Sequence, residues 1–291
     1  MNDKIIVSVS GGKDSTAVCL HLFELGYTKD QFDRVFMDTG WEHEGTYEYL
    51  DELEKTIGKI IRIKADVKVR PEHKEYVDYF EKKLKFESQF VRRVFLYTGF
   101  PRRNVKWCTK DLKVTPIKKY FDQLDYDFIN AVGIRKEESP RRSKMTEWEY
   151  NDYFDCDVWR PIIDWTEQEV IDIHHRFGLT PNRLYLNGSN RVGCYPCINS
   201  RKKEIKRLPP ERIALIKELE DVITKLRRER LGKDQEAATF FQSVVRGEIM
   251  NIEEMSQWSR TSYGGKQFEM FEKEPPTCIK WGMCDLSSKR V

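Results

Sequence analysis

The chain has 291 residues, enough for one large domain or two modest ones with a sizeable hydrophobic core. Hydrophobic residues make up 39% and charged residues 34% of it, and its apolar runs fall short of the roughly 18 residues that a membrane span needs. With no signal-peptide pattern at its start, we expect a cytoplasmic protein without membrane partners. The 51 Lys and Arg residues nearly balance the 48 Asp and Glu residues, which excludes general polyanion binding by charge alone.

Apolar runs of strand length alternate with helical patterns along the first two thirds of the chain. Four runs are expected to form strands: Ile5–Val9, Arg34–Met37, Ile60–Ile63 and Phe128–Val132. Three segments have the apolar spacing of helices: Thr16–Leu25, Thr46–Ile57 and Val114–Leu124. This alternation predicts an α/β fold, with a parallel twisted sheet and helices on both of its faces. Residues 71–104 interrupt the alternation and are expected to form a helical insertion.

The last third of the chain has a more helical character. Thr166 and Glu169 form a capping box that predicts a helix over Glu167–Phe177. Two further helices are expected, over Pro209–Arg230 and Gln235–Ile249. We therefore expect one α/β domain over residues 1–205, followed over residues 206–291 by a helical extension and a cysteine-containing tail.

A loop rich in glycine and hydroxyl groups lies between the first expected strand and the first expected helix. It reads Ser8-Val9-Ser10-Gly11-Gly12-Lys13-Asp14-Ser15-Thr16. Backbone N–H groups and the helix dipole at such a position favour an anion, and two glycines let the backbone approach phosphate oxygens closely. The loop is not a Walker A motif, because the spacing before Gly-Lys is too short. We expect a phosphate site made by Ser8, Ser10, Gly11, Gly12, Lys13, Asp14 and Ser15.

The six residues Ser10–Ser15 read SGGKDS, which resembles the pyrophosphate-loop (PP-loop) signature of the adenine nucleotide α-hydrolase-like superfamily. That group includes ATP pyrophosphatases and phosphoadenylylsulfate (PAPS) reductases. Asp38–Glu42 (DTGWE) and Gly133–Ser139 (GIRKEES) are similar to the DTG and GxRxxES segments of the PAPS reductase branch. The resemblance, over roughly residues 4–205, implies an adenine nucleotide at the carboxyl edge of the sheet, with Gly133 and Arg135 near its anionic end.

Several charged residues near these motifs allow more than one interpretation. Asp38 and Glu42 have oxygens that can hold Mg²⁺ or accept from a ribose hydroxyl, or they belong to an exposed turn. Arg135 can form a cationic rim for phosphate or sulfate with nearby basic residues, which are Arg141, Arg142 and Lys144. The alternative for the last three is a solvated charged loop.

Seven cysteines in a chain of cytosolic character favour metal or redox use over structural disulfides. Cys194-Tyr-Pro-Cys197 alone fits a redox pair, half a zinc site or part of an iron–sulfur site. The segment from Cys108 to Pro116 resembles the part of assimilatory adenylylsulfate reductases that holds two adjacent cysteines. Those enzymes bind a [4Fe-4S] cluster through that pair and a downstream GCxPC, which Gly193–Cys197 matches.

The resemblance therefore implies a [4Fe-4S] cluster on Cys108, Cys194 and Cys197. Thr109 stands where the second adjacent cysteine is expected, so a fourth ligand must come from the tail. Cys284 is preferred over Cys278 for this role, and zinc remains an alternative to the cluster. Cys19 is expected to be a buried packing residue. The role of Cys156 is undecided, with a surface thiol as the simplest interpretation. The pair His174-His175 is expected to lie in the core or on the surface, without a metal.

The tail lacks the ECGxH motif that carries the nucleophilic cysteine of sulfonucleotide reductases. The resemblance then favours an ATP pyrophosphatase or adenylyltransferase that uses Mg²⁺ and cleaves ATP between the α- and β-phosphates, with Lys13, Asp14 and Arg135 in catalysis. By similarity to tRNA thiolation enzymes and the DNA phosphorothioation sulfur-transfer component, it would activate an acceptor, such as a nucleic acid, for sulfur transfer. The sulfur would come from a donor such as a cysteine desulfurase.

Two other functions stay open. One is a PAPS or adenylylsulfate reductase that produces sulfite. The other is a non-catalytic subunit that binds a nucleotide or a nucleic acid through basic runs, although such runs also occur on solvated helix faces. The runs are Arg201–Lys203, Lys206-Arg207 and Arg227-Arg228, with Trp258 and Tyr263 downstream.

Overall fold

The computed structural model describes residues 4–232, 235–241, 244–245, 248–261 and 281. At its centre is a six-stranded sheet of order β3-β2-β1-β4-β6-β5, in which β5 is antiparallel to β6 and the other pairs are parallel. The strands are β1 (Lys4–Val9), β2 (Phe32–Asp38), β3 (Ile61–Lys64), β4 (Phe128–Val132), β5 (Trp148–Asn151) and β6 (Cys156–Trp159). The expected α/β fold with a mostly parallel sheet is confirmed.

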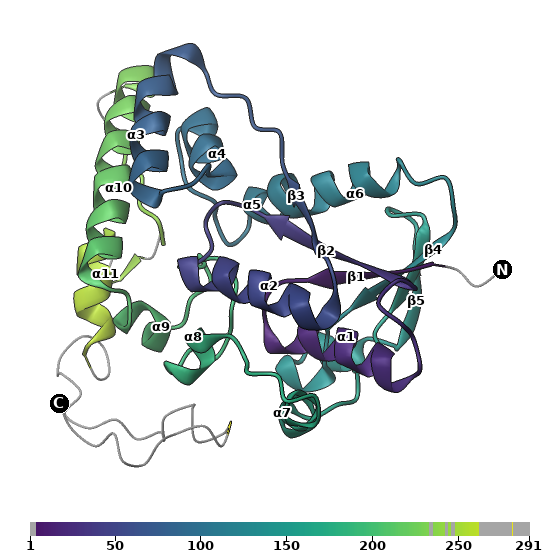
Figure 1. Cartoon of the computed structure of the whole chain (residues 1–291). Helices are drawn as coiled ribbons and strands as arrows, with labels where there is room; N and C mark the ends of the chain where they lie inside the picture. The colour runs from purple at the N-terminus through teal and green to yellow at the C-terminus, as the bar shows by residue number, and fades with distance from the viewer. Residues whose placement is uncertain (1–3, 233–234, 242–243, 246–247, 262–280, 282–291) are drawn as a thin grey trace.

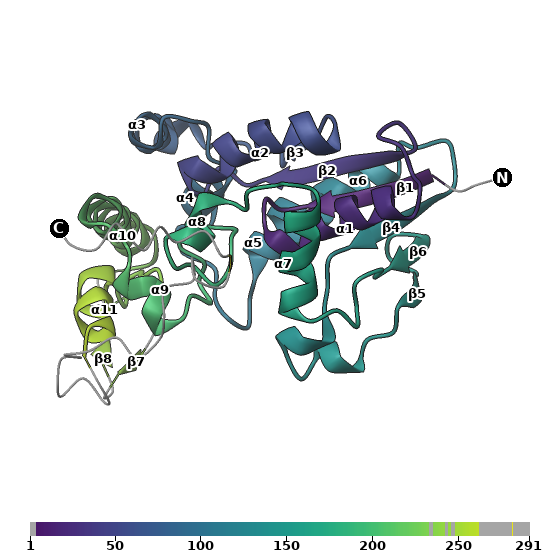
Figure 2. The ribbon, with the colours of Figure 1, turned by 60° about the horizontal axis from the view of Figure 1, so that its bottom comes forward.

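Helices cover both faces of the sheet (Figures 1 and 2). They are α1 (Lys13–Glu24), α2 (Glu44–Ile57), α6 (Thr115–Phe121) and α7 (Glu167–Arg176). The shorter elements of this part of the chain are α5 (Trp107–Thr109), the π-helical turn η2 (Lys110–Val114) and α8 (Arg183–Leu186). Side chains along β1 alternate between the two faces, as a central strand requires. Val7 packs in the core that α1, α2 and α7 share, whereas Ile6 packs against Ile117 and Phe121 of α6. The predicted capping box of α7 is present, with reciprocal hydrogen bonds between Thr166 and Glu169.

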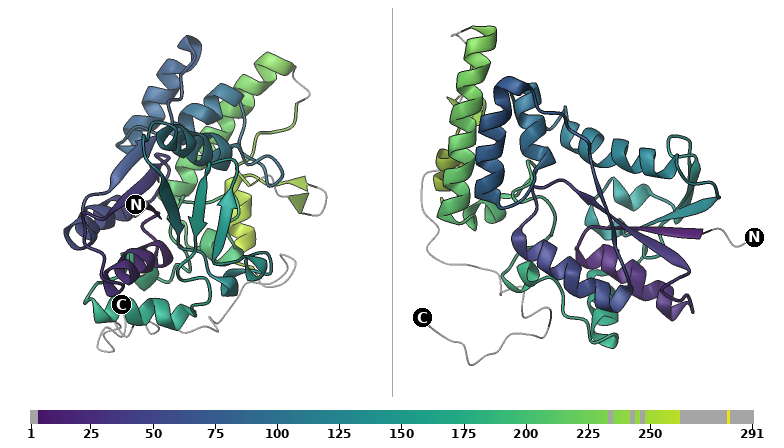
Figure 3. Two further views of the ribbon diagram at one scale, coloured as in Figure 1. Left: turned by 90° about the vertical axis from the view of Figure 1, so that its right-hand side faces the viewer. Right: turned by 45° about the horizontal axis from the view of Figure 1, so that its top comes forward.

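The carboxyl ends of the parallel strands face a second group of helices (Figure 3). This group consists of the 3₁₀ turn η1 (Pro71–His73), α3 (Lys74–Leu84), α4 (Gln89–Tyr97), α9 (Lys202–Lys206), α10 (Pro210–Leu231) and α11 (Ile252–Ser259). Two short 3₁₀ turns, η3 (Lys136–Glu138) and η4 (Arg142–Lys144), follow β4. None of the described helices has the length and apolar composition that a membrane crossing needs.

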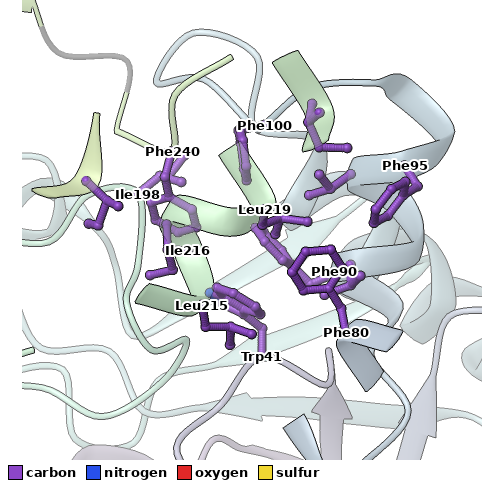
Figure 4. Close-up of a cluster of buried hydrophobic side chains, with 14 of the residues drawn as sticks. Trp41, Phe80, Phe90, Phe95, Phe100, Ile198, Leu215, Ile216, Leu219 and Phe240 are labelled. Carbon is purple, nitrogen blue, oxygen red and sulfur yellow. The ribbon is translucent and has the colours of Figure 1, made fainter. Parts of the chain in front are cut away.

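One aromatic core joins the insertion between β3 and α5 to the chain after residue 197 (Figure 4). Trp41, from the turn after β2, stacks on Phe90 of α4 with ring centroids 4.6 Å apart and on Phe240 at 5.9 Å. Leu219 of α10 is fully buried in the same core. Burial of one large apolar side chain stabilises a fold by about 1.5–3 kcal/mol. Because Trp41 is buried in this core, the core holds the turn that ends β2 in position.

The helix expected over Gln235–Ile249 is wrong. The structure has an antiparallel pair of short strands there, β7 (Val244–Val245) and β8 (Glu248–Ile249). Two adjacent β-branched valines and the nearby Gly247 have low helix propensity, which outweighs the apparent helical spacing. The next helix, α11, begins at a capping box between Asn251 and Glu254.

The edge strands β5 and β6 were not among the predicted elements. Each has four residues, and polar side chains interrupt its apolar pattern. Because β6 pairs with both β4 and β5, Cys156 is buried with 5% exposure, which excludes the surface thiol that was its simplest interpretation. Cys19, in contrast, is fully buried in α1, which confirms its packing role.

Candidate functional site

The loop between β1 and α1 is built by glycines and hydroxyl groups. Gly11 has φ +71°, a left-handed conformation that favours glycine, and Gly12 is the N-cap of α1. The backbone N–H of Ser10 donates to Ser15 Oγ over 3.0 Å, and the two serine hydroxyls lie 3.2 Å apart. Ser8 lies within β1, and its hydroxyl donates to Asn130 of β4, apart from the other loop donors. The loop thus presents a fixed backbone at a helix start, which suits an anion.

The strand β4 ends directly against this loop. A Cβ atom at Gly133 would lie 2.7 Å from the backbone of Asp14, closer than real Cβ contacts allow. Glycine at this position therefore lets the end of β4 approach the first turn of α1. The next residues of the chain place Arg135 beside the loop, where the Arg135 side chain is buried with 4% exposure.

Asp14 bridges the two cations of the site. Its Oδ2 lies 2.8 Å from Lys13 Nζ, and its Oδ1 accepts from Arg135 Nε over 2.6 Å. Burial pushes the pKa of the Asp14 carboxyl upward, but Lys13 and Arg135 outweigh this effect and hold the pKa below its ordinary value. Arg135 also pairs with Glu137 at 2.6 Å. The site thus holds two buried cations in fixed positions around one carboxylate.

The other basic residues of the expected rim do not join this centre. Arg142 pairs with Glu138, four residues earlier in the chain, and Arg141 and Lys144 are exposed. These three residues form a charged loop with η4 at its centre, as the alternative interpretation proposed.

Asp38 and Glu42 are buried in the turn after β2, so their interpretation as an exposed turn is wrong. Asp38 accepts hydrogen bonds from the Gly40 N–H over 2.9 Å and from the Tyr47 hydroxyl over 2.8 Å. Glu42 accepts from the Thr39 hydroxyl, from the Trp41 N–H and from the same tyrosine. Burial, together with these two carboxylates, raises the pKa of Tyr47 far above its ordinary value. The carboxylates therefore have protein donors, which leaves few free oxygen positions for a metal.

Asp38 also lines a cavity of about 430 Å³ at the carboxyl ends of β2 and β3, with Tyr47, Phe86 and Lys64. Lys64 Nζ lies 3.5 Å from Asp38 Oδ2. The rings of Tyr47 and Phe86 are 5.2 Å apart in a tilted arrangement. Aromatic side chains beside a carboxylate and an ammonium group can accommodate a base and a ribose hydroxyl.

A second cavity, of about 510 Å³, extends from Ser10 of the phosphate loop to Cys108, Cys194 and Cys197. The three cysteines that the resemblance grouped together thus line one cavity. Lys113, from the π-helical turn η2, lines the same cavity. Its pKa is raised, first by the Cys194 thiol and then by the nearby carboxylate of Glu42.

The Cys194–Cys197 loop is attached to the turn after β2 through its backbone. Glu42 and Cys194 form an antiparallel β-bridge, and the Tyr195 N–H donates to the Trp41 carbonyl over 2.8 Å. The indole N–H of Trp41 donates to the Pro196 carbonyl over 3.1 Å. This attachment fixes the cysteine loop beside the carboxyl edge of the sheet.

Burial disfavours the thiolate form of two of these cysteines. Burial raises the pKa of Cys194 to about 11, with Lys113 acting in the opposite direction, and burial also raises the pKa of Cys108. Across the part of the chain that the structure describes, no group of three or more His, Cys, Asp or Glu side chains is arranged to hold a metal ion. The proposed fourth ligands, Cys284 and Cys278, lie outside the described residues.

Two residues that support the phosphate loop were missed in the sequence. The Tyr185 hydroxyl accepts from the Lys13 N–H over 3.1 Å, and the Asn182 side chain donates to the Gly11 carbonyl over 3.4 Å. Both come from the segment around α8, about 170 positions away in the chain. Only tertiary contact reveals the role of Tyr185, because no local pattern distinguishes it from a packing residue.

His174 and two residues of the basic runs make contacts within the fold. His174 is fully buried, burial lowers its pKa to about 4, and its Nδ1 lies 2.7 Å from the Val170 carbonyl oxygen, so the expected core position is confirmed. Lys202 lies over the Trp258 ring, and Arg207 donates to the Gly188 carbonyl. Tyr263 lies outside the described residues.

Residues 4–200 match the phosphoadenosine phosphosulfate reductase domain family. The 37.8 kDa protein in the gpa 5′ region of Escherichia phage 186 is 31% identical, over 96% of each chain. A protein of Methanocaldococcus jannaschii is 30% identical over 75% of this chain. The matched region covers 41% of the length of that relative. The adenosine 5′-phosphosulfate reductase of Neisseria meningitidis serogroup A is 27% identical over 55% of this chain and 59% of its own.

Two solved structures are also similar. PAPS reductase from Candida auris has a TM-score of 0.47 at 15% identity, over 67% of this chain and 82% of its own. The U34-tRNA thiolase of Methanococcus maripaludis with its [4Fe-4S] cluster has a TM-score of 0.33 at 14% identity, over 88% and 81%. The family match covers more than half of the chain and includes the phosphate loop, Arg135 and the Cys194–Cys197 loop. The chain therefore belongs to the phosphoadenosine phosphosulfate reductase domain family, within the PP-loop superfamily.

Proposed function

We propose that the protein is an ATP pyrophosphatase or adenylyltransferase that cleaves ATP between the α- and β-phosphates to activate an acceptor for sulfur transfer. The observation that carries this proposal is the Lys13–Asp14–Arg135 arrangement on a phosphate loop at the carboxyl edge of the sheet. Two buried cations beside a helix N-terminus suit the polyphosphate of ATP.

In this proposal the loop binds the β- and γ-phosphates through the backbone of Gly11 and Gly12 and the hydroxyls of Ser10 and Ser15. Gly133 keeps the loop close to β4, and Ser8 supports it from within β1. Asp38 accepts from the ribose, in the cavity that Tyr47 and Phe86 line. Mg²⁺ would enter with ATP, because the carboxylates of the site already have protein donors.

The proposed reaction has two displacements. An acceptor oxygen attacks the α-phosphorus, the bond to the bridging oxygen breaks, and pyrophosphate leaves with the electron pair. Lys13 and Arg135 stabilise the charge that develops on pyrophosphate, and Asp14 holds both cations in position. A sulfur nucleophile then attacks the acceptor atom that carries the adenylated oxygen. The bond from that atom to the oxygen breaks and AMP leaves, so that sulfur replaces oxygen in the acceptor.

Cys108, Cys194 and Cys197, with Cys284 or Cys278 as the fourth ligand, would hold a [4Fe-4S] cluster, with zinc as the alternative. The lining of one cavity by three thiols supports this assignment, and Lys113 offers a positive charge to an anionic thiolate cluster. When bound, such a cluster would accept or deliver sulfur, or stabilise the site. Cysteines that hold a cluster suit a reducing compartment such as the cytoplasm.

The tail assignment has support from Trp281, a described residue of the C-terminal segment. Its side chain shares a cluster with Val192, which is two positions from Cys194. Cys278 and Cys284 are each three positions from Trp281 in the sequence, a separation that extended chain spans in about 10 Å. The position of Trp281 beside Val192 therefore supports a ligand from this part of the sequence.

A second candidate function is reduction of PAPS or adenylylsulfate to sulfite. The similarity to the adenosine 5′-phosphosulfate reductase of Neisseria meningitidis favours it, but the ECGxH motif that would supply the nucleophile is absent from the sequence.

In the first proposal, the acceptor of sulfur would be a nucleic acid and the sulfur donor a cysteine desulfurase. A nucleotide- or nucleic-acid-binding subunit without turnover is the outcome if neither reaction occurs.

Anaerobically purified protein distinguishes these functions. One sample is incubated with ATP and Mg²⁺, with a nucleic acid and sulfide, and another with PAPS or adenylylsulfate and a thiol reductant. Pyrophosphate without sulfite supports the first proposal, whereas sulfite supports the reductase. Lys13→Ala protein is the control, because it must lose either activity if the loop binds the nucleotide.

A further inference from the structure

Trp281 is buried far from its neighbours in sequence. Its side chain is 2% exposed, in a small apolar cluster with Ile171 of α7 and Tyr185 of α8. The indole meets the His174 ring edge-on, with centroids 5.3 Å apart at 83°, and lies 6.0 Å from the Tyr185 ring at 38°. Aromatic contacts in these geometries stabilise beyond the area that they bury.

The backbone of Trp281 is held as well as its side chain. The His175 Nε2 lies 3.0 Å from the Trp281 carbonyl oxygen, in hydrogen-bond range. His174 of α7 thus packs its ring against the indole. The adjacent His175 contacts the Trp281 carbonyl oxygen, and its ring also lies near the indole. Trp281 is therefore held in the fold through both its side chain and its backbone.

Tyr185, which packs against Trp281, also supports the phosphate loop. Tyr185 is 3% exposed, and its hydroxyl accepts from the Lys13 N–H over 3.1 Å. The same hydroxyl lies 3.2 Å from the position that a Cβ of Gly12 would take. Lys13 Nζ lies 5.9 Å from the Tyr185 ring centroid. One side of Tyr185 therefore contacts Trp281, and its hydroxyl contacts the first turn of α1.

We propose that Trp281 is a positioning residue for the phosphate loop, which acts through Tyr185. With the indole in place, the phenol ring cannot move away from α1, and its hydroxyl keeps the Lys13 backbone in the position that binds phosphate. Burial of the Trp281 side chain and nucleotide binding are then coupled, and the coupling is reciprocal by thermodynamic linkage. The inference rests on the proposed function only in that the loop binds nucleotide phosphates.

The first test does not need a nucleotide. Hydrogen exchange of the backbone amides of residues 10–16 is measured in wild-type protein, Trp281→Ala, Trp281→Phe and Trp148→Ala. Trp148 is 48% exposed on the edge strand β5 and is the matched control. We expect faster exchange in the loop for Trp281→Ala, partial restoration for Trp281→Phe and no change for Trp148→Ala. Unchanged loop exchange in Trp281→Ala would overturn the proposal.

The second test measures coupling to the ligand. The Kd for ATP with Mg²⁺ is determined by calorimetry for Trp281→Ala, Tyr185→Phe and the double variant. We expect Trp281→Ala to raise Kd about tenfold, within the usual range of coupling between sites. The double variant should lose little more than one single variant, because both act through the Tyr185 hydroxyl. Additive losses would contradict action through Tyr185.

The two tests separate this inference from the proposed function. If wild-type protein does not bind ATP, the proposed function fails, and the hydrogen-exchange comparison still decides whether Trp281 positions the loop. If wild-type protein binds ATP and Trp281→Ala binds it equally well, the proposed function stands and the inference about Trp281 is wrong.

Discussion

Glu42 and Cys194 lie opposite each other in an antiparallel β-bridge, with Cys194 Sγ 3.9 Å from Glu42 Oε1. The pair links two segments that are 152 positions apart, the turn that ends β2 and the loop that carries two of the grouped cysteines. The cavity that contains these cysteines reaches Ser10. The three thiols and Ser10 of the phosphate loop therefore line one continuous cavity.

Replacement of Arg135 by Gln is expected to lower kcat/KM for pyrophosphate release by about 10²–10³-fold, the usual cost of removing one preorganised charge stabiliser. The variant leaves Asp14 with Lys13 as its partner and removes the second cation from the leaving group. Lys136→Gln is the matched control, since Lys136 pairs with Asp164 outside the site. Equal activity of Arg135→Gln and wild type, measured by steady-state pyrophosphate release, would exclude Arg135 from the reaction.

Gly133→Ala is expected to disrupt the nucleotide site although it adds a single methyl group. The new Cβ would lie 2.7 Å from the Asp14 backbone, so β4 and α1 must move apart, at a cost of about 1–3 kcal/mol in stability. Calorimetry should show weaker ATP binding together with a lower Tm. Gly99→Ala serves as the control, because its nearest neighbour would be at 3.9 Å. A Gly133→Ala protein with normal ATP affinity would show that the close approach is not needed.

The free energy of unfolding is expected to depend on pH through Glu220 of α10. This carboxylate is 2% exposed, accepts from the Phe240 and Ile252 N–H groups, and has a pKa that burial raises to about 7. Between pH 4.5 and 7 the folded state binds the Glu220 proton more tightly than the unfolded state, so the contribution of Glu220 to stability falls by up to about 3 kcal/mol as pH rises. Buried His174, whose pKa is lowered to about 4, contributes in the opposite direction over much of the same range.

Urea unfolding at a series of pH values checks this prediction. Glu220→Gln should remove the Glu220 contribution, so that the stability of the variant relative to wild type rises by up to about 3 kcal/mol between pH 4.5 and 7, because an amide does not titrate. Glu218→Gln is the control and should keep it, since Glu218 lies on the same helix and has a pKa below its ordinary value. A stability difference between wild type and Glu220→Gln that does not change with pH would exclude Glu220 as a source of the pH dependence.

Cys194→Ser and Cys197→Ser are each expected to abolish bound iron in protein purified without oxygen. Loss of one of four thiolates leaves a [4Fe-4S] cluster with an incomplete ligand set. Iron and acid-labile sulfide per chain are the measurements, with metal analysis for zinc alongside. Cys156→Ser, buried on β6 in the sheet, controls for loss of any cysteine. Iron retained by Cys194→Ser and Cys197→Ser would refute the cluster assignment, and zinc without iron would support the alternative.

The sequence was sufficient to predict local features of the fold. The phosphate loop, the strands β1 to β4 and the α7 capping box could be predicted because each depends on residues close together in the chain. Cys156 and the strand β6 could not, because β6 is short and becomes buried only by pairing with β4 and β5. The β7–β8 pair was mistaken for a helix because apolar spacing was given more weight than the β-branched valines.

The site itself was predictable where a motif carries it and hidden where tertiary contact carries it. Gly133 and Arg135 follow from a motif, and the structure places both beside Asp14. Tyr185 and Trp281 belong to no motif, and their positions behind the loop result from packing of α7 and α8.

The central claim is that ATP is cleaved between its α- and β-phosphates on the loop that carries Lys13. ³¹P NMR of an anaerobic reaction with ATP, Mg²⁺, sulfide and a nucleic acid identifies the phosphorus products directly. The proposed function predicts AMP and pyrophosphate in equal amounts with wild-type protein and neither with Lys13→Ala. ADP with orthophosphate, or intact ATP in a preparation that forms sulfite from PAPS, would contradict it.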